Sequence, residues 1–257
     1  MLKHAILYPL FLVAGCIASL VGIFGGSFIW FLVVLLLAIG LTTWGAFDIR
    51  LGYFTPTFFR KKYNAEGRVA LTFDDGPSLH TTEVLRLLKA YQSKATFFCI
   101  GKQVLAYPHI AKQIVDEGHT IGNHTYAHPK SFGFLKEKDV VAELEQCSSI
   151  IYQTVGKTPK LFRPPFGVTN PSVAKGVQYT KQQIIGWSNR SLDTVTLQED
   201  KIYERVCKKL KSGDIILFHD TSQRTVNVLK RLLPYLQKQG YISVSVDDLL
   251  NLHGYEK

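Results

Sequence analysis

Two adjacent carboxylates, Asp74 and Asp75, follow a run of apolar and β-branched residues in the segment ALTFDDGP, residues 70–77. Two acids placed side by side each raise the free energy of ionising the other, unless a cation lies between them. Asp and Gly are also common in turns, so the segment alone fits a strand followed by a turn equally well. Polar residues elsewhere in the chain must therefore decide whether the two acids form a site.

Two histidines lie four residues apart in the segment HTYAH, as His124 and His128. This spacing places two imidazoles on one face of a helix, but Pro129 disfavours helix at His128 and favours a short turn. Two histidines and one carboxylate form a ligand set with open positions, which suits Zn²⁺ at a catalytic site and also Fe²⁺ or Co²⁺. The sequence therefore predicts a divalent metal bound by both histidines and by Asp75 or Asp74.

The remaining aspartate is then free to accept a proton from a water molecule whose pKa the metal lowers. Arg163, in the segment RPPFG, is a candidate for keeping this base ionised. His219, in LFHD, can act as general acid, and Asp193, in WSNRSLD, can orient the imidazole and raise its pKa. The segment RPPFG is either a rigid loop alone or a loop that aims a backbone N–H at a developing oxyanion.

These polar groups follow apolar β-type segments that alternate with amphipathic segments from residue 68 onward. We expect seven strands, at residues 69–73, 95–100, 119–122, 161–163, 183–187, 214–218 and 241–246. Helical periodicity marks residues 81–91, 142–155 and 225–240. The alternation predicts an α/β fold of parallel βαβ units, either a closed or nearly closed β/α barrel or an open doubly wound sheet. In a barrel, catalytic side chains lie at the carboxyl ends of the strands.

The first part of the chain has a different composition, because no Asp, Glu, Lys or Arg occurs between Lys3 and Asp48. This run is too long for one membrane span and fits two, near residues 5–24 and 27–44, with the break at GIFGGSF. A secretory signal is the alternative, and LVAGC resembles a lipoprotein processing site at Cys16. The apolar sequence that continues after Cys16 argues against it.

We therefore expect a membrane segment at 1–47, a linker at 48–67, a catalytic domain at 68–250 and a tail at 251–257. The formal charge of +10 suits a domain near an anionic surface such as phospholipid headgroups or acidic wall polymers. No motif for nucleic-acid binding accompanies this charge. Four widely spaced cysteines without C-x-x-C predict neither a disulfide framework nor a cysteine metal site.

Residues 68–250 resemble the NodB-type polysaccharide deacetylases, carbohydrate esterase family 4. The resemblance lies in five motifs in the family's order: TFDDG (72–76), HTYAH (124–128), RPPFG (163–167), WSNRSLD (187–193) and LFHD (217–220). It implies a distorted (β/α) barrel of seven or eight units and metal-dependent removal of N-acetyl groups from amino-sugar polymers.

The resemblance also implies a role for each matching residue. The metal, usually zinc, would be bound by Asp75, His124 and His128. The catalytic residues would be Asp74 as base, Arg163 holding it, His219 as acid and Asp193 tuning that acid. The substrate would contact the backbone N–H of Phe166, together with Pro165, Trp187 and Leu217. Two positions depart from the family: Phe166 stands where Tyr is usual, and Thr194 where an aromatic residue is common.

Three functions remain open at this point. The first is deacetylation of peptidoglycan or a chitin-like glycan by an enzyme in the bacterial inner membrane, with no obligate protein partner. The second is deacylation or deformylation of a polyprenyl-phosphate-linked amino sugar. The third is non-catalytic glycan binding, which the complete set of motif residues argues against. The basic residues beside both spans favour a cytoplasmic domain by the positive-inside rule, but we expect the domain on the external face, because polymer substrates dominate the family that it resembles.

Overall fold

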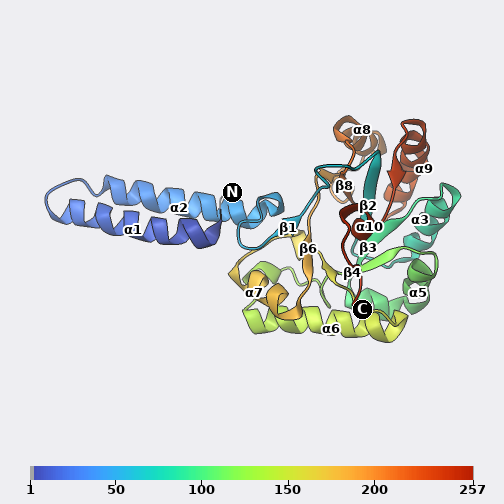
Figure 1. The fold of residues 1–257 in the computed structure, drawn as a ribbon, viewed down its shortest axis with the longest axis horizontal. Helices are drawn as coiled ribbons and strands as arrows, with labels where there is room; N and C mark the ends of the chain where they lie inside the picture. The colour runs from blue at the N-terminus through green and yellow to red at the C-terminus, as the bar shows by residue number, and fades with distance from the viewer. Residues whose placement is uncertain (1–2, 257) are drawn as a thin grey trace.

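The computed structural model describes residues 3–256, which form a helical hairpin and an α/β domain (Figure 1). The hairpin consists of α1 (His4–Ile23) and α2 (Ile29–Phe47), which lie side by side close to the predicted bounds. Both helices are long and apolar enough to cross a membrane, because about 20 residues at roughly 1.5 Å each extend about 30 Å.

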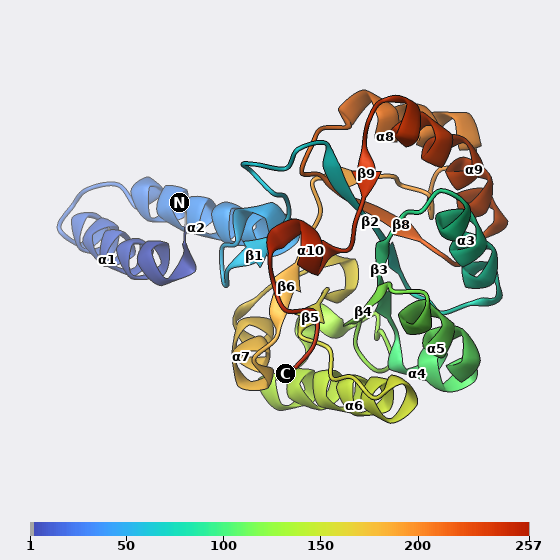
Figure 2. The same ribbon diagram turned by 45° about the vertical axis from the view of Figure 1, so that its right-hand side comes forward.

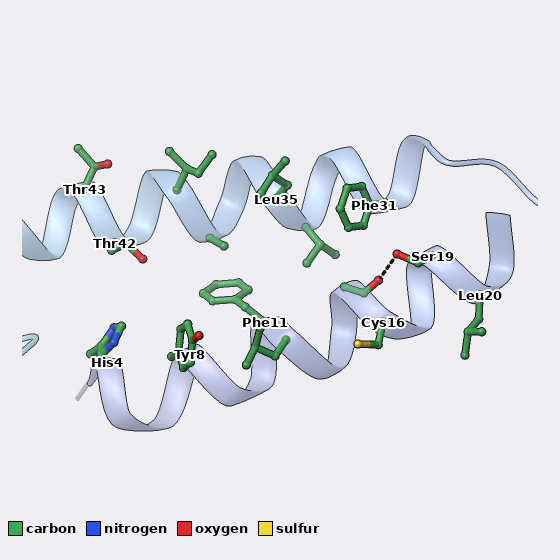
Figure 3. Close-up of a pocket in the computed structure, with 15 residues that line it drawn as sticks. His4, Tyr8, Phe11, Cys16, Ser19, Leu20, Phe31, Leu35, Thr42 and Thr43 are labelled. Atoms are coloured by element: carbon green, nitrogen blue, oxygen red, sulfur yellow. Dashed lines mark hydrogen bonds between the residues drawn. The ribbon is translucent and has the colours of Figure 1, made fainter. Parts of the chain in front are cut away.

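An apolar groove of about 880 Å³ lies between α1 and α2 (Figure 3). Phe11 of α1 and Phe31 of α2 both line it, and the Ser19 hydroxyl donates a hydrogen bond to the Gly15 carbonyl at 2.8 Å. Nearly all the large side chains of the hairpin are exposed. Within residues 3–256, therefore, the two helices are not core helices of the domain.

The base of the hairpin packs tightly on the domain. The His4 N–H donates to the Tyr53 carbonyl at 2.9 Å, and the Thr169 N–H donates to the Ala46 carbonyl at 3.0 Å. A Cβ on Gly45 would lie 2.3 Å from the Tyr53 ring, so only glycine allows this approach. These contacts orient the domain relative to the hairpin.

The domain is built on a curled sheet whose strand pairs are all parallel. Its order is β1-β6-β5-β4-β3-β2-β8-β7, and β9 pairs with β2. The strands are β1 (Thr57–Phe58), β2 (Arg68–Asp74), β3 (Ala95–Cys99), β4 (Thr120–Asn123), β5 (Leu161–Phe162), β6 (Gln183–Ile185), β7 (Asn189–Arg190), β8 (Ile215–His219) and β9 (Ile242–Ser243).

Helices surround the curled sheet (Figure 2). They are α3 (Leu79–Ala90), α4 (Gly101–Ala106), α5 (Pro108–Asp116), α6 (Glu137–Val155), α7 (Pro171–Thr180), α8 (Glu199–Lys209), α9 (Gln223–Lys238) and α10 (Val246–Leu250). Among residues 3–256 no strand pairing joins β1 to β7, so the sheet forms a half-barrel that stays open on one side. The structure thus confirms the α/β, barrel-type fold predicted from the sequence.

Alternation along β2 explains how this strand serves both the core and the site. Val69, Leu71 and Phe73 are fully buried and pack in the hydrophobic cluster that includes α3 and α9. The residues between them face the inside of the half-barrel, because successive side chains of a strand point to opposite faces. Thr72 and Asp74 therefore share the inner face.

One predicted strand needs correction, and the segments expected as a linker and a tail both contact the domain. The strand expected at 241–246 ends at Ser243, because Ser245 caps α10 and accepts a hydrogen bond from the Asp248 N–H at 3.4 Å. The segment predicted as a linker contains β1, which pairs with β6. Residues of the predicted tail pack on the domain, where the Tyr255 hydroxyl accepts a hydrogen bond from the Ile121 N–H at 2.8 Å.

Candidate active site

Several parallel strands deliver polar residues to the same edge of the sheet. β2 ends at Asp74, β4 at Asn123 and β8 at His219, and Asp74 is paired with His219 in the β2–β8 register. Loops that follow the strands complete a cavity of about 240 Å³ at this edge. Its lining consists of Asp74, Asp75, His124, His128, Phe166, Gly167, Trp187, Arg190, Thr194, Leu217 and His219.

Asp75, His124 and His128 direct three potential ligand atoms at one point. Asp75 Oδ1 lies 3.4 Å from His124 Nε2 and 3.6 Å from His128 Nε2, and all three atoms lie within 4.8 Å of one another. Ligand atoms at the corners of a tetrahedron, each about 2.1 Å from a zinc ion, are separated by roughly 3.4 Å. The spacing therefore fits a small divalent metal.

Two further observations fit a metal at this point. Asp75 Oδ1 is buried and makes no hydrogen bond within the described chain, and a bound cation would satisfy this oxygen. His124 Nδ1 lies 2.7 Å from the Arg163 carbonyl, which only accepts, so Nδ1 carries a proton and Nε2 is the nitrogen that faces Asp75 and can bind a metal.

The loop after β4 is shaped by residues that the sequence analysis did not identify. The buried Asn123 accepts the Thr125 N–H at 2.8 Å and donates to the Leu144 carbonyl of α6 at 2.8 Å. Glu143 of α6 accepts the Ala127 N–H at 2.8 Å. These bonds hold the chain in a loop with positive φ at His128, which agrees with the predicted turn.

Arg163 is fully buried and binds Asp74 directly. Its Nη1 donates to Asp74 Oδ1 and to the Thr72 hydroxyl, each at 2.8 Å. Its other nitrogens donate to the Ile185 carbonyl at 3.1 Å and the Gly186 carbonyl at 2.9 Å. These hydrogen bonds are directional, and together they hold the Asp74 carboxylate in one orientation.

His219 and Asp193 form a second buried pair. His219 Nδ1 lies 2.9 Å from Asp193 Oδ1, while the His219 N–H and the Thr225 hydroxyl each donate to Asp193 Oδ2 at 2.8 Å. The free Nε2 of His219 lies 4.0 Å from Asp75 Oδ2, on the cavity side. Thr225 was not identified from the sequence, because it lies on α9 and only the fold brings it to Asp193.

The charges of these pairs shift the ionisation of their members. Burial disfavours the charged form of His219, but the hydrogen bond to Asp193 outweighs burial and raises the pKa of His219 to about 9. Burial opposes ionisation of Asp75, yet His124 holds the pKa of that carboxyl well below its usual range. Burial and the neighbouring His124 lower the pKa of His128, which keeps its imidazole neutral, the form that binds metals.

The residues predicted to contact substrate lie in different environments. Phe166 is 56% exposed, and its N–H meets no hydrogen-bond acceptor among the described residues. Trp187 and Leu217 line the cavity, and a Cβ on Gly167 would lie 2.4 Å from the Trp187 ring. Pro165 is buried and lies outside the described lining of the cavity.

Two more polar residues near the cavity were not identified from the sequence. Arg190 lines the cavity from β7. Asp220 is fully buried below Gly76, and burial raises its pKa to about 7. The available signal was their place in the motifs WSNRSLD and LFHD, because Arg190 lies between Trp187 and Asp193, and Asp220 follows His219.

The fold and the site together define a class: a half-barrel β/α hydrolase with acid–base groups and a possible Asp-His-His metal site at the carboxyl edge of its sheet. Residues 61–185 match the family model described as polysaccharide deacetylase. A peptidoglycan-N-acetylglucosamine deacetylase of Bacillus cereus is 40% identical over 193 residues, which cover 73% of this chain and 90% of that protein.

Two further similarities agree with this match. A peptidoglycan-N-acetylmuramic acid deacetylase of Bacillus subtilis is 35% identical over 191 residues, 72% of each chain. The crystal structure of a peptidoglycan N-acetylglucosamine deacetylase in complex with an N-oxidanyl-benzamide has a TM-score of 0.74 at 32% identity, covering 78% of this chain and 95% of that one. The chain belongs to the polysaccharide deacetylase family, carbohydrate esterase family 4. It is by class a carbohydrate deacetylase, a hydrolase of carbon–nitrogen bonds other than peptide bonds.

Proposed function

We propose that the chain removes N-acetyl groups from amino sugars of peptidoglycan, with a divalent metal as cofactor. The observation that carries the proposal is the cluster of two carboxylates and three imidazoles at one edge of the sheet. The two similar proteins named above act, by their names, on N-acetylglucosamine and on N-acetylmuramic acid. Peptidoglycan is therefore the supported polymer, and both of its sugars are candidates.

Asp75, His124 and His128 would hold the metal, and their nitrogen and oxygen atoms suit Zn²⁺ or Co²⁺. When bound, the metal would lower the pKa of a water molecule and polarise the acetamide carbonyl. His124 is oriented for this role by its hydrogen bond to the Arg163 carbonyl.

Asp74 is proposed as the base that accepts a proton from the attacking water. Its Oδ1 is held by Arg163, and its Oδ2 lies 3.9 Å from His124 Nε2, beside the proposed metal position. The hydrogen bond from the buried guanidinium therefore fixes the orientation of the Asp74 carboxylate, with Oδ2 on the side of His124.

His219 is proposed as the acid that protonates the departing amine. Asp193 occupies Nδ1 of the imidazole, so only Nε2 faces the cavity and can deliver a proton there. The Phe166 N–H, which has no acceptor among residues 3–256, is proposed to donate to the oxyanion of the tetrahedral intermediate. Trp187 and Leu217 would enclose the acetyl methyl group.

Non-catalytic glycan binding is the less supported alternative. A relict site would lack a metal ligand, a base or an acid. Every one of these groups is present, and the orienting residues Arg163 and Asp193 make hydrogen bonds to the base and the acid. A catalytic site explains this arrangement, whereas glycan binding does not require it.

We propose that α1 and α2 anchor the enzyme in the inner membrane as a transmembrane hairpin of residues 1–47, followed by a linker (48–67), the deacetylase domain (68–250) and a tail (251–257). The exposed apolar surface of both helices supports a membrane anchor, and a signal sequence is the alternative. A peptidoglycan substrate favours an external domain, although Lys3 and Arg50 beside the spans favour the cytoplasm by charge. A reporter at the C-terminus that is active on only one side of the membrane tests the topology.

One observation favours the second candidate function, deacylation of a polyprenyl-phosphate-linked amino sugar. A pocket of about 300 Å³ at the base of the hairpin is lined by Lys3, Arg50, Arg60 and Lys62. These cations would favour a substrate held at an anionic membrane surface. This candidate requires the same chemistry and differs in its substrate.

The test of the proposed function is acetate release by the zinc-loaded full chain in non-ionic detergent. We expect release from peptidoglycan fragments, and loss of release in Asp74→Asn while the zinc content stays the same. Absence of release from peptidoglycan fragments and chitooligosaccharides would contradict a peptidoglycan deacetylase. Deacylation of a lipid-linked amino sugar in the same preparation would then support the second candidate.

A further inference from the structure

Arg190 places a positive charge at the wall of the candidate active site. It belongs to β7, its side chain is exposed, and it lines the 240 Å³ cavity together with Trp187 and Leu217. The three metal-ligand candidates and both proposed acid–base residues line the same cavity. A substrate that reaches these groups must therefore pass close to the guanidinium.

The backbone at Arg190 is held on both sides, whereas the end of its side chain is free. In the β7–β8 pairing Arg190 lies opposite Leu217, and the Ser191 N–H donates to the Leu217 carbonyl at 3.1 Å. Arg205 Nε donates to the Arg190 carbonyl at 2.9 Å. The Arg190 guanidinium carbon lies 5.6 Å from the centre of the Trp187 ring, which orients the guanidinium over the cavity wall.

The charge of Arg190 has no counter-ion in the described part of the chain. No Asp or Glu among residues 3–256 lies within ion-pair distance of its guanidinium. Nor do the acids of the site need it, because Arg163 pairs with Asp74 and a divalent cation would offset Asp75. An unpaired arginine over a substrate cavity is available to bind an anion of the substrate.

We propose that Arg190 forms an anion-binding subsite, which selects glycans that carry a carboxylate or a phosphate next to the acetylated sugar carbon. This inference rests on the proposed deacetylase function. The acetamide of an amino sugar is on C2, so a substituent on C3 or C1 is its closest neighbour. A muramic acid carries a lactyl carboxylate on O3, and a lipid-linked sugar carries a phosphate on C1.

The alternative is that Arg190 only stacks on Trp187 and stabilises the cavity wall. A stacking role would depend on the planar side chain and would be indifferent to the charge of the substrate. An anion subsite predicts that substrate preference follows the charge at position 190. The two roles are therefore separated by the ratio of rates for an anionic and a matched neutral substrate.

The experiment measures kcat/KM for acetate release by the zinc-loaded full chain in non-ionic detergent. The first pair of substrates is a peptide-free peptidoglycan tetrasaccharide and the same saccharide with its carboxyl groups amidated. The second pair is N-acetylglucosamine 1-phosphate and the methyl glycoside of N-acetylglucosamine. The first pair differs in a carboxylate carried on O3, and the second pair differs in a phosphate carried on C1. The two pairs therefore show which of these anions Arg190 binds.

We expect the wild-type protein to prefer the anionic member of one pair about tenfold, which corresponds to two unit charges roughly 6 Å apart in a medium between protein surface and water. Raising the salt concentration should reduce this preference. Arg190→Gln should bring the ratio close to one, Arg190→Lys should retain most of it, and Arg190→Glu should reverse it. Lys138→Gln, an exposed change on α6 with the same loss of charge, should leave the ratio unchanged.

Equilibrium binding of the same four saccharides to Asp74→Asn separates this inference from the proposed function. If the ratio of binding constants for the anionic and the neutral saccharide changes with the charge of residue 190, the subsite is supported. Absence of acetate release in the wild-type protein would then overturn only the deacetylase assignment. Equal binding and equal rates within both pairs, or a preference that Arg190→Gln does not change, would overturn the subsite and leave the deacetylase assignment intact.

Discussion

Substitution of Arg163 by Met should strongly destabilise the domain, because it removes the positive charge that pairs with the buried Asp74 carboxylate. The Asp74 carboxylate is 4% exposed, and Arg163 provides the guanidinium that pairs with it at 2.8 Å. Met leaves this carboxylate buried without its counter-charge and also leaves the Ile185 and Gly186 carbonyls without donors. Loss of one member of a buried ion pair costs about 3–5 kcal/mol. In a domain of some 200 residues this lowers the melting temperature by roughly 10 °C.

A double-mutant cycle combines Arg163→Met with Asp74→Asn. The effect of Asp74→Asn on stability should be of opposite sign in the wild-type protein and in the Arg163→Met variant. Asp74→Asn alone leaves Arg163 bonded to Thr72 and to two carbonyls, so we expect a loss of about 1–3 kcal/mol. In the Arg163→Met background, Asp74→Asn removes an unpaired buried charge, and we expect it to raise stability by about 1 kcal/mol. The difference between the two backgrounds is the coupling energy of the pair.

The assay is urea unfolding of the metal-free full chain in non-ionic detergent, followed by far-UV circular dichroism. A chelator is included because metal binding to the folded state would add its own stabilisation. Lys230→Met is the matched control, since it breaks an exposed pair with Glu83 and should change stability by less than about 1 kcal/mol. If Asp74→Asn destabilised both backgrounds equally, the pairing of charges would not be what stabilises this part of the site.

Three further predictions concern the metal, the pH dependence and the cavity wall. His124→Ala removes one candidate ligand atom, and elemental analysis should find at least about tenfold less zinc in the purified protein; unchanged zinc would place the metal elsewhere. Burial lowers the pKa of His119 from 6.5 to about 4, so the unfolded chain binds the extra proton and stability is lost as the pH falls below 6.5. At pH ~4.5 the loss should be about 2.5 kcal/mol in urea unfolding and should be absent in His119→Gln; an equal loss in both would assign it to other groups. In Gly167→Ala, a residue with positive φ gains a Cβ that would lie 2.4 Å from the Trp187 ring. Acetate release should fall about tenfold or more while the zinc content stays unchanged. Full activity would show that the position of the Trp187 ring does not matter for the reaction.

Much of the candidate site could be predicted because its residues lie in short segments with distinctive chemistry. Asp74 and Asp75 end an apolar strand, and His124 and His128 lie in one loop, so local pattern was sufficient to identify them. Arg190 was not identified, because a two-residue strand leaves no periodic signal.

The orienting residues escaped prediction for a different reason. Asn123, Glu143 and Thr225 act through hydrogen bonds to residues of the site, and each of them is a common residue type in an ordinary strand or helix. Their partners lie on other elements or across a tight loop. No spacing in the sequence distinguishes them from other buried polar residues.

The sequence by itself determined the local structure: the apolar hairpin, the alternation of strands and helices, and which residue types end each strand. These follow from hydrophobic periodicity and turn chemistry, which act over a few residues. Only the tertiary structure decided that Asp74 pairs with His219, which lies 145 positions later in the sequence. It also decided that Arg163 reaches Asp74 across the half-barrel. It also left Asp75 Oδ1 without a partner and Arg190 without a counter-ion in the described chain. Such contacts depend on the order and curl of the strands, because residues distant in sequence become neighbours only when the sheet brings their strand ends together.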